Sequence, residues 1–221
     1  MTETRSEKVD LKKELTHLYR ASGKEVVEVE VPEMSFLMVD GAGDPNVSRS
    51  FKEAVEALYA VSYTLKFAVK EEAGIDYGVM PLEGLWWMDG GEPSDGGQPS
   101  FDDIQQSKDA WKWTMMILQP EWVTGERVER ALATVEMKKE LPALPRLRFE
   151  AFREGLAAQV MHVGPFSGEK PTVEKVDGFI RARGGAPRGR HHEIYLKDFR
   201  RTAPENLKTI IRHPFESAGE E

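Results

Sequence analysis

Two glutamates stand among aromatic residues in segments whose composition is typical of β-strands. Glu83 lies in the segment MPLEGLWW and Glu193 lies in the segment HHEIYL. Side chains alternate between the two faces of a strand, so Glu193 shares a face with His191 and Tyr195. A desolvated carboxylate has a raised pKa, which suits a group that transfers protons near neutral pH. Structural carboxylates held by backbone groups or by an arginine stay open as the alternative.

Aromatic residues are concentrated near the first of these glutamates. All five tryptophans lie between Trp86 and Trp122, next to a polar, glycine-rich segment that runs from Asp89 to Ser100. Alternating aromatic residues in a strand are typical of a packed core, whereas their concentration beside a polar loop favours a wall on which a flat or cationic ligand stacks. The residues expected to bind the ligand are Glu83, Trp87, Trp113, Tyr77, Tyr63 and Met115.

No metal or cofactor is expected. The sequence has no cysteine, which excludes thiolate chemistry and cysteine-based zinc sites. His191 and His192 are adjacent, so on a strand they point to opposite faces and cannot easily bind one ion. Neither His162 nor His213 stands in a context typical of a heme ligand.

The elements that position these residues follow an order that occurs twice. In the first half, residues 26–31 and 35–39 form a strand pair hinged at Pro32-Glu33. A helix capped by Ser48 runs to Gly74, and strands follow at residues 77–87 and 111–118. In the second half, residues 147–152 and 156–163 form the pair, hinged at Glu154-Gly155. A helix that carries Val173, Val176 and Ile180 and strands at 190–197 and 207–212 complete it, the last strand stopping at Pro214.

We therefore predict an α+β fold of tandem duplicated strand–helix–strand–strand modules with pseudo-two-fold symmetry. The halves span about 25–120 and about 146–215 and are joined by a helix at 124–139, while residues 1–24 form a short helical extension. Each half has one sheet face covered by its helix, so the free faces are expected to form a central cleft that both glutamates line.

Composition limits the classes of partner. The formal net charge of -8 argues against a nucleic-acid-binding surface. The apolar runs are shorter than a membrane span, and the charged N-terminus is unlike a signal peptide. We expect a cytoplasmic monomer or homodimer that binds neither nucleic acid nor membrane.

Four segments resemble the GyrI-like (gyrase-inhibitor-like) small-molecule-binding family. They are residues 77–87, 154–165, 191–198 and 207–214, and the likeness extends from about Glu25 to near the end of the chain. The resemblance implies a SOUL-like, barrel-like sandwich and an aromatic or cationic small molecule as ligand. It also implies that Glu193 is the glutamate that meets this ligand.

Stand-alone members similar to this chain are implicated in hydrolysing the cyclopropane rings of DNA-alkylating natural products. For this chain the resemblance implies that Glu193 activates water and that Tyr195 donates a hydrogen bond to the developing phenolate-type oxygen, while Trp87 and Trp113 stack on the flat ring system. Two other functions stay open: non-catalytic binding of cationic or aromatic drugs, and a gyrase-inhibitor-like interaction with a macromolecule.

Overall fold

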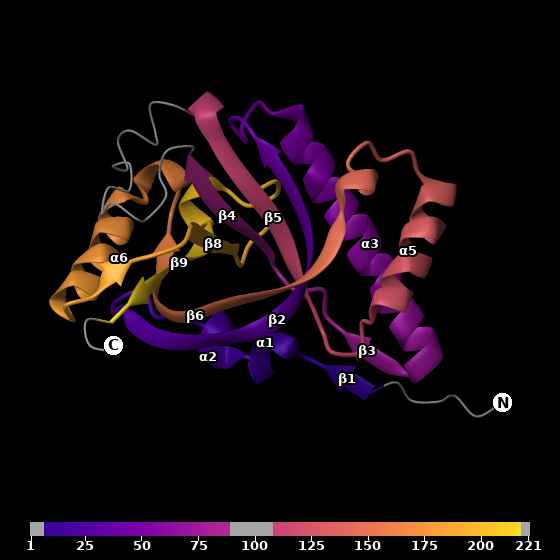
Figure 1. The fold of residues 1–221 in the computed structure, drawn as a ribbon, viewed down its shortest axis with the longest axis horizontal. Coiled ribbons are helices and arrows are strands. Elements are labelled where there is room, and N and C mark those ends of the chain that lie inside the picture. The colour runs from indigo at the N-terminus through magenta and orange to yellow at the C-terminus, as the bar shows by residue number, and fades with distance from the viewer. Residues whose placement is uncertain (1–6, 89–107, 218–221) are drawn as a thin grey trace.

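A closed ring of antiparallel strands forms the centre of the molecule (Figure 1). The computed structural model describes residues 7–88 and 108–217, so the predicted loop from Asp89 to Ser100 lies outside the described residues. The ring has the order β6-β2-β5-β4-β8-β9, and β9 pairs with β6 to close it. Its strands are β2 (Val27–Ala42), β4 (Leu82–Met88), β5 (Trp111–Gln119), β6 (Arg148–Val163), β8 (His191–Tyr195) and β9 (Lys208–Glu216). The α+β class is confirmed, while the internal duplication and its symmetry stay predictions.

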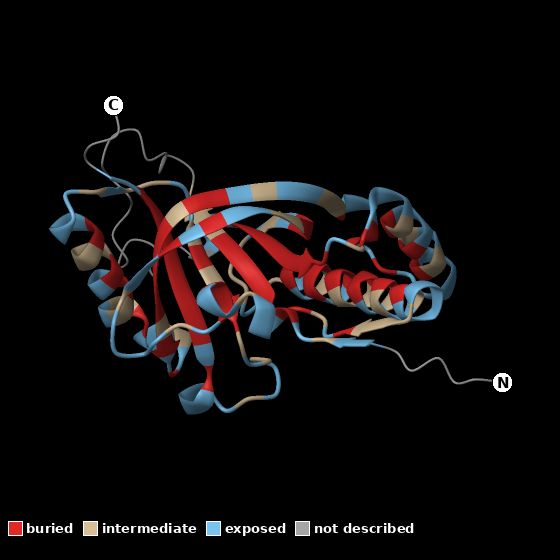
Figure 2. Ribbon diagram, turned by 90° about the horizontal axis from the view of Figure 1, so that it is seen from below, coloured by how far each residue is buried: buried red, intermediate tan, exposed pale blue. Residues whose placement is uncertain are grey.

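Three long helices in the described part of the chain lie outside this ring. Helix α3 (Arg49–Ala73) begins where the Ser48 hydroxyl accepts a hydrogen bond of 3.3 Å from the Phe51 amide, and it ends at Gly74, whose φ of 70° is left-handed. Its apolar stripe faces the sheet, and α5 (Gly125–Lys138) packs beside it (Figure 2). Helix α6 (Lys170–Ala182) covers β6 and β9. Among the described residues no helix is long and apolar enough to cross a membrane.

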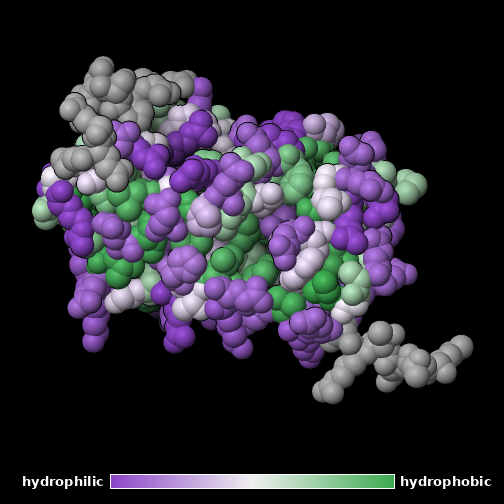
Figure 3. Space-filling view, turned by 60° about the horizontal axis from the view of Figure 1, so that its bottom comes forward, coloured by the Kyte–Doolittle hydropathy of each residue, from purple (hydrophilic) through white to green (hydrophobic). Residues whose placement is uncertain are grey.

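Smaller elements complete the fold. Strands β1 (Glu7–Val9) and β3 (Ile75–Tyr77) form a parallel pair, and β7 (Ala186–Pro187) extends the sheet beyond β9. The segment expected as one helical extension instead contains β1 and two single-turn helices, α1 (Leu11–Glu14) and α2 (Thr16–Tyr19). Because Leu18 and Tyr19 are buried, this segment belongs to the core. On the face drawn in Figure 3, apolar patches lie between hydrophilic side chains.

The predicted hinges at Pro32 and Glu154-Gly155 lie inside continuous strands, so the predicted strand pairs were wrong. Strand β2 pairs with β6 on both sides of Pro32, with Val31 opposite Gly155 and Glu33 opposite Arg153. Pro32 has no N–H to donate and Gly155 has a φ of 74°, so pairing is interrupted for one step. The side chains change faces at this point. The stop predicted at Pro214 was also wrong, because β9 runs on to Glu216.

The strand register divides the barrel residues between two faces. Gly84 lies opposite both Met115 and Glu193, and these residues share the face on which α3 and α6 pack, which we call the helix-covered face. Glu83 lies opposite Ile194, one step along, so both point to the barrel interior. The two glutamates therefore point to opposite faces of the barrel wall, and the expectation that both line one cleft was wrong by one residue of register.

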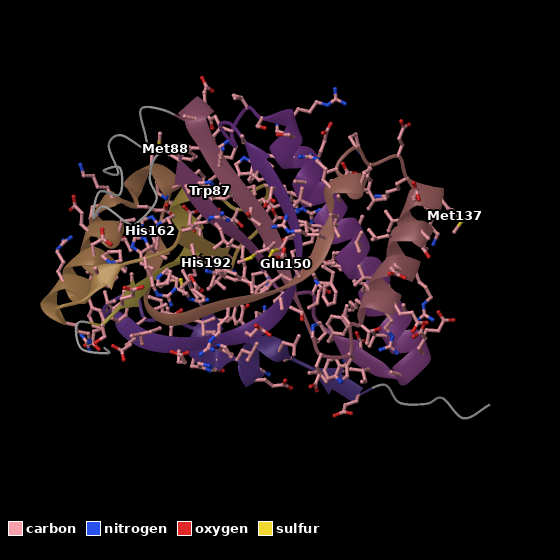
Figure 4. The ribbon with its side chains drawn as sticks, viewed as in Figure 1. Trp87, Met88, Met137, Glu150, His162 and His192 are labelled. Atoms are coloured by element: carbon pink, nitrogen blue, oxygen red, sulfur yellow. The ribbon has the colours of Figure 1, made fainter. Side chains whose placement is uncertain are left out.

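Charged residues meet in the barrel interior around His192. Glu83 is 0% exposed and His192 is 1% exposed, and Figure 4 labels His192 within the ring of strands. The His192 ring lies 3.0 Å from a Glu83 oxygen through Nε2 and 3.0 Å from Glu154 through Nδ1. Tyr19 donates a 2.7 Å hydrogen bond to Glu83, and Arg212 donates one of 3.1 Å to Glu154. We call these five residues the interior network.

Arg212 also ties this network to the N-terminal segment. It donates to the Gln159 side chain at 3.0 Å and to the Leu18 carbonyl at 2.8 Å, while Gln159 donates to the His17 carbonyl at 2.7 Å. Every buried charge in the network therefore has a partner of opposite charge, which is the condition for its burial. The strands β4, β6, β8 and β9 and helix α2 are joined at one point.

The pKa values in the network favour a charged His192 next to an ionised Glu154. Burial alone would lower the pKa of His192, but Glu154 and then Glu83 raise it to about 9. Burial alone would raise the pKa of Glu154, but His192 and Arg212 hold it at about 2. Opposite charge outweighs desolvation at both groups.

The folded state is therefore expected to lose stability at alkaline pH. The contribution of His192 is complete below its unfolded-state pKa of about 6.5 and is lost as the pH rises through about 9. The loss amounts to about 3 kcal/mol, since one pKa unit equals about 1.4 kcal/mol. Urea unfolding measured from about pH 6 to about pH 10 checks this.

A matched control is His17→Gln, because the His17 side chain is exposed and lies outside the network. This variant should show the same alkaline decline as the wild type. A free energy of unfolding that stays constant between pH 6.5 and about 9 in the wild type would contradict a buried cationic His192.

Candidate functional site

Glu193 lies on the helix-covered face at the centre of β8. Its side chain is 14% exposed, and one carboxylate oxygen lies 3.0 Å from Nε2 of His191. Alternation along β8 places His191, Glu193 and Tyr195 on this one face, as the sequence indicates. Glu193 is thus a partly exposed carboxylate next to an imidazole, unlike the fully buried Glu83.

A chain of hydrogen bonds extends from Glu193 to helix α6. Nδ1 of His191 lies 2.7 Å from Nε2 of His213, and Nδ1 of His213 lies 2.8 Å from Asp177. Burial would raise the pKa of Asp177, but His213 lowers it, so the carboxylate is ionised. Burial lowers the pKa of His213 despite Asp177, so its ring is neutral.

These charge states fix the direction of the chain. The ionised Asp177 accepts from Nδ1–H of His213, whose Nε2 is then an acceptor. His191 must therefore donate through Nδ1, and its Nε2 shares one proton with the facing Glu193 oxygen. The chain Asp177–His213–His191 holds the Glu193 carboxylate in place and backs it with a proton donor, which is an arrangement suited to acid–base chemistry.

Tyr195 and Trp86 extend the site along the same face. The Trp86 indole N–H donates a 3.0 Å hydrogen bond to the Tyr195 hydroxyl, which is also hydrogen-bonded to Glu193. Burial and the nearby Glu193 raise the pKa of Tyr195, so the phenol keeps its proton and acts as a donor. Gly84 lies beneath them: a Cβ there would stand 2.8 Å from Nε1 of Trp86 and 3.0 Å from the Tyr195 hydroxyl.

Aromatic rings surround this pair. Phe166 and Phe199 meet the Tyr195 ring edge to face, with centroids 5.7 and 5.5 Å away. Phe51, at the start of α3, stacks on Trp86 at 6.1 Å. The pocket beside Tyr195 has a cavity volume of about 10 Å³, roughly the room for one water molecule, whereas ligand pockets typically measure roughly 300–1,000 Å³. The aromatic side chains therefore close over Tyr195 in this structure, and a larger ligand has to displace them.

The other predicted ligand-binding residues lie in several places. Trp113 and Met115 share the helix-covered face and are fully buried, and the Trp113 ring fills the space above Gly41. The remaining four are not next to Glu193. Glu83 is in the interior network, and Trp87 lies under the Arg190 guanidinium at 3.6 Å. Tyr77, at the end of β3, packs against Trp122, and Tyr63 is 49% exposed on α3.

Sequence reasoning missed Trp86, Glu169 and the roles of His191 and His213. Trp86 is one residue from the expected Trp87. Strand pairing places Gly84 opposite Glu193, so Trp86 and not Trp87 shares the face of Glu193, and the sequence alone does not give this register. Glu169 stands at the N-cap of α6, where a carboxylate normally caps the helix, but its side chain makes no capping hydrogen bond and is 3% exposed. Nothing in the sequence marks Glu169 as a buried site residue, because a glutamate at a helix N-cap is usually exposed.

Glu169 completes a group of three possible ligand atoms. Single atoms of Glu169, His191 and Glu193 lie within 4.8 Å of one another. Two carboxylates and an imidazole are a donor set that a divalent cation accepts. The expectation that no metal or cofactor binds stays a prediction.

Comparison with known proteins identifies relatives along nearly the whole chain. An uncharacterized conserved protein from Listeria innocua is 38% identical, has a TM-score of 0.82, and aligns over 94% of this chain and 100% of its own. Two structures described as hydrolases from Listeria innocua are 36% and 38% identical, with TM-scores of 0.79 and 0.81. They cover 94% and 95% of this chain and 100% of their own. No curated protein matches significantly.

The family model described as the GyrI-like small molecule binding domain matches residues 115–216. This range contains β5, β6, β8, β9 and α6, and hence Glu193, Tyr195 and the histidine chain behind them. The chain therefore belongs to one family with the Listeria innocua proteins, and its family is that of the GyrI-like small molecule binding domain.

Proposed function

We propose that this protein is a hydrolase that adds water to a flat, cyclopropane-containing electrophile bound on the helix-covered face. The observation that carries the proposal is the Glu193 carboxylate, which is partly exposed, backed by His191 and next to the Tyr195 phenol. Two full-length relatives described as hydrolases support the same class of reaction. The cyclopropanoid substrate follows from the family resemblance of the sequence.

The chemistry uses the groups in the order in which they lie. Glu193 takes a proton from a water molecule, whose oxygen forms a bond to the methylene carbon of the strained ring. The ring C–C bond breaks, and its electron pair moves through the conjugated system to the carbonyl oxygen. Tyr195 keeps its own proton and turns its O–H from Glu193, which is now protonated, to donate a hydrogen bond to this phenolate-type oxygen.

Binding of the substrate requires the aromatic cover to open. The rings of Phe166 and Phe199 occupy the space against Tyr195, and Trp86 lies on the same face as Glu193 and is hydrogen-bonded to Tyr195. A flat substrate that replaces these rings regains aromatic contact with Trp86 and excludes bulk water from Glu193. We therefore assign ligand stacking to Trp86 ahead of Trp87.

Glu193→Gln should lower the rate of water addition by about 100-fold or more, because an amide cannot accept the proton from water. Ligand affinity should change by less than about threefold, since the amide keeps the size and hydrogen-bonding capacity of the side chain. Mass spectrometry of a duocarmycin-like compound after incubation measures the water adduct, and titration of tryptophan fluorescence measures affinity.

Glu33→Gln is the matched control, because Glu33 is an exposed strand residue on β2. Unchanged ligand recovered from the wild type despite tight binding would contradict hydrolysis and support a non-catalytic binding protein.

Trp86→Leu should weaken ligand binding by about three- to tenfold, the range expected when one aromatic stacking partner is lost. Trp87→Leu should leave affinity near the wild-type value, because Trp87 points to the opposite face and contacts Arg190. Calorimetric titration of both variants with the same compound compares them. A larger loss of affinity at Trp87 than at Trp86 would place the ligand on the face opposite Glu193 and contradict the assignment.

A further inference from the structure

We propose that Glu169 is the acid of this site and gives its proton to the substrate oxygen that becomes negative as the ring opens, while Glu193 acts as the base. The inference rests on the proposed function and assigns a catalytic role to a residue outside the sequence-predicted site. Three features support this role: Glu169 is buried, one of its oxygens has no hydrogen-bond partner among the described residues, and it lies close enough to Glu193 for the two carboxyl groups to share one proton.

Glu169 is a buried carboxyl group, and one of its oxygens has no hydrogen-bond partner among the described residues. The side chain is 3% exposed, and the oxygen without a partner is Oε1. A buried carboxylate without a cation is costly, whereas a neutral carboxylic acid is much less so. Although the N-terminus of α6 favours a negative charge there, the side chain does not cap the helix.

A second carboxyl group lies close by. One Glu169 oxygen lies within 4.8 Å of a Glu193 oxygen and of a His191 ring nitrogen. Two carboxylates this close in a partly buried site strongly disfavour double ionisation, so the pair retains a proton. Burial, and then the charge of Glu193, raise the pKa of Glu169 well above its ordinary value, so Glu169 is the member that keeps the proton.

The titratable groups around Glu169 are consistent with this assignment. Strand β8 presents His191, Glu193 and Tyr195 to it. Behind His191, His213 of β9 and Asp177 of α6 form the rest of the hydrogen-bond chain. Lys170 follows Glu169 in the chain at the start of α6. The His191 imidazole lies within 4.8 Å of both carboxyl groups and is hydrogen-bonded to Glu193.

Substrate entry gives Glu169 access to the reacting oxygen. Phe166 begins the 3-10 turn Phe166–Gly168, which leads directly into Glu169, and its ring packs on Tyr195. Displacement of Phe166 by a flat substrate therefore removes cover from the same segment that holds Glu169. The acid is then on the same side of the substrate as the Tyr195 donor.

The proton balance closes with this assignment. Glu193 gains one proton from water, and Glu169 loses one to the substrate oxygen, so the product is the substrate plus one water. The carboxyl pair holds one proton before and one proton after the reaction. Transfer of this proton from Glu193 back to Glu169, across at most 4.8 Å, restores the starting state.

Glu169→Gln tests the role of the residue. The variant should lower kcat by about 100-fold, with ligand affinity within about threefold of the wild type, and kcat/KM should lose its alkaline decline. Folding is checked by thermal unfolding at neutral pH, which should change little because a neutral amide replaces a neutral acid. Glu174→Gln, an exposed residue on the same helix, is the matched control and should behave as the wild type in every measurement.

An infrared measurement without substrate tests the protonation state by itself. The wild type at neutral pH should show the C=O band of a protonated carboxyl group, which Glu169→Gln removes and Glu174→Gln retains. Two results would overturn the acid role of Glu169 and leave the hydrolase function intact. One is a Glu169→Gln variant as active as the wild type, and the other is a C=O band that this substitution leaves unchanged. A wild type that forms no water adduct would overturn both.

Titration of the metal-free protein with Zn²⁺ and with Mn²⁺ tests the alternative that Glu169, His191 and Glu193 form a cation site. Neither ion should bind tightly, since a protonated Glu169 is a poor ligand. Tight binding that Glu169→Gln abolishes would overturn the acid role and assign a cation site to Glu169, His191 and Glu193.

Discussion

The buried cation of His192 between Glu83 and Glu154 is the interaction on which the barrel depends. It joins β4, β6 and β8, and Arg212 extends the contact to β9 and to the segment before β2. Removal of one member of such a network leaves an uncompensated buried charge, which costs about 3–5 kcal/mol. Around His192 the interior of the barrel is therefore filled by a structural group of buried charges. The proposed chemistry lies on the outer, helix-covered face.

Alternation along β8 separates these two tasks. His192 points inward to the structural network, while His191 and Glu193 point outward to the candidate site. One short strand thus anchors the fold and presents the reactive groups, so the position of Glu193 is as rigid as the barrel itself. The rings that cover Tyr195 come from turns, at Phe166 and Phe199, which are easier to move than strands. A rigid base and a displaceable cover are what a small-molecule hydrolase needs.

Local features of the sequence predicted the elements well. Ser48 and Gly74 fixed the ends of α3, and alternation placed Glu193 with Tyr195 and Trp113 with Met115. Features that depend on pairing between distant segments were not predictable, because one residue of register exchanges the faces of a strand. This is why Glu83 and Trp87 were expected beside Glu193, where Gly84 and Trp86 lie. Glu169 was missed because its burial depends on how the start of α6 packs on the sheet, which leaves no pattern in the sequence.

The most direct test compares Glu83→Gln with Glu193→Gln in stability and turnover. Both substitutions replace a glutamate by an amide on paired strands one register step apart. A structural interior and a reactive outer face predict opposite outcomes. Glu83→Gln should lower the free energy of unfolding by several kcal/mol and leave the turnover of the folded fraction near wild type, whereas Glu193→Gln should abolish turnover with little loss of stability. Equal effects of the two substitutions on both quantities would contradict this division.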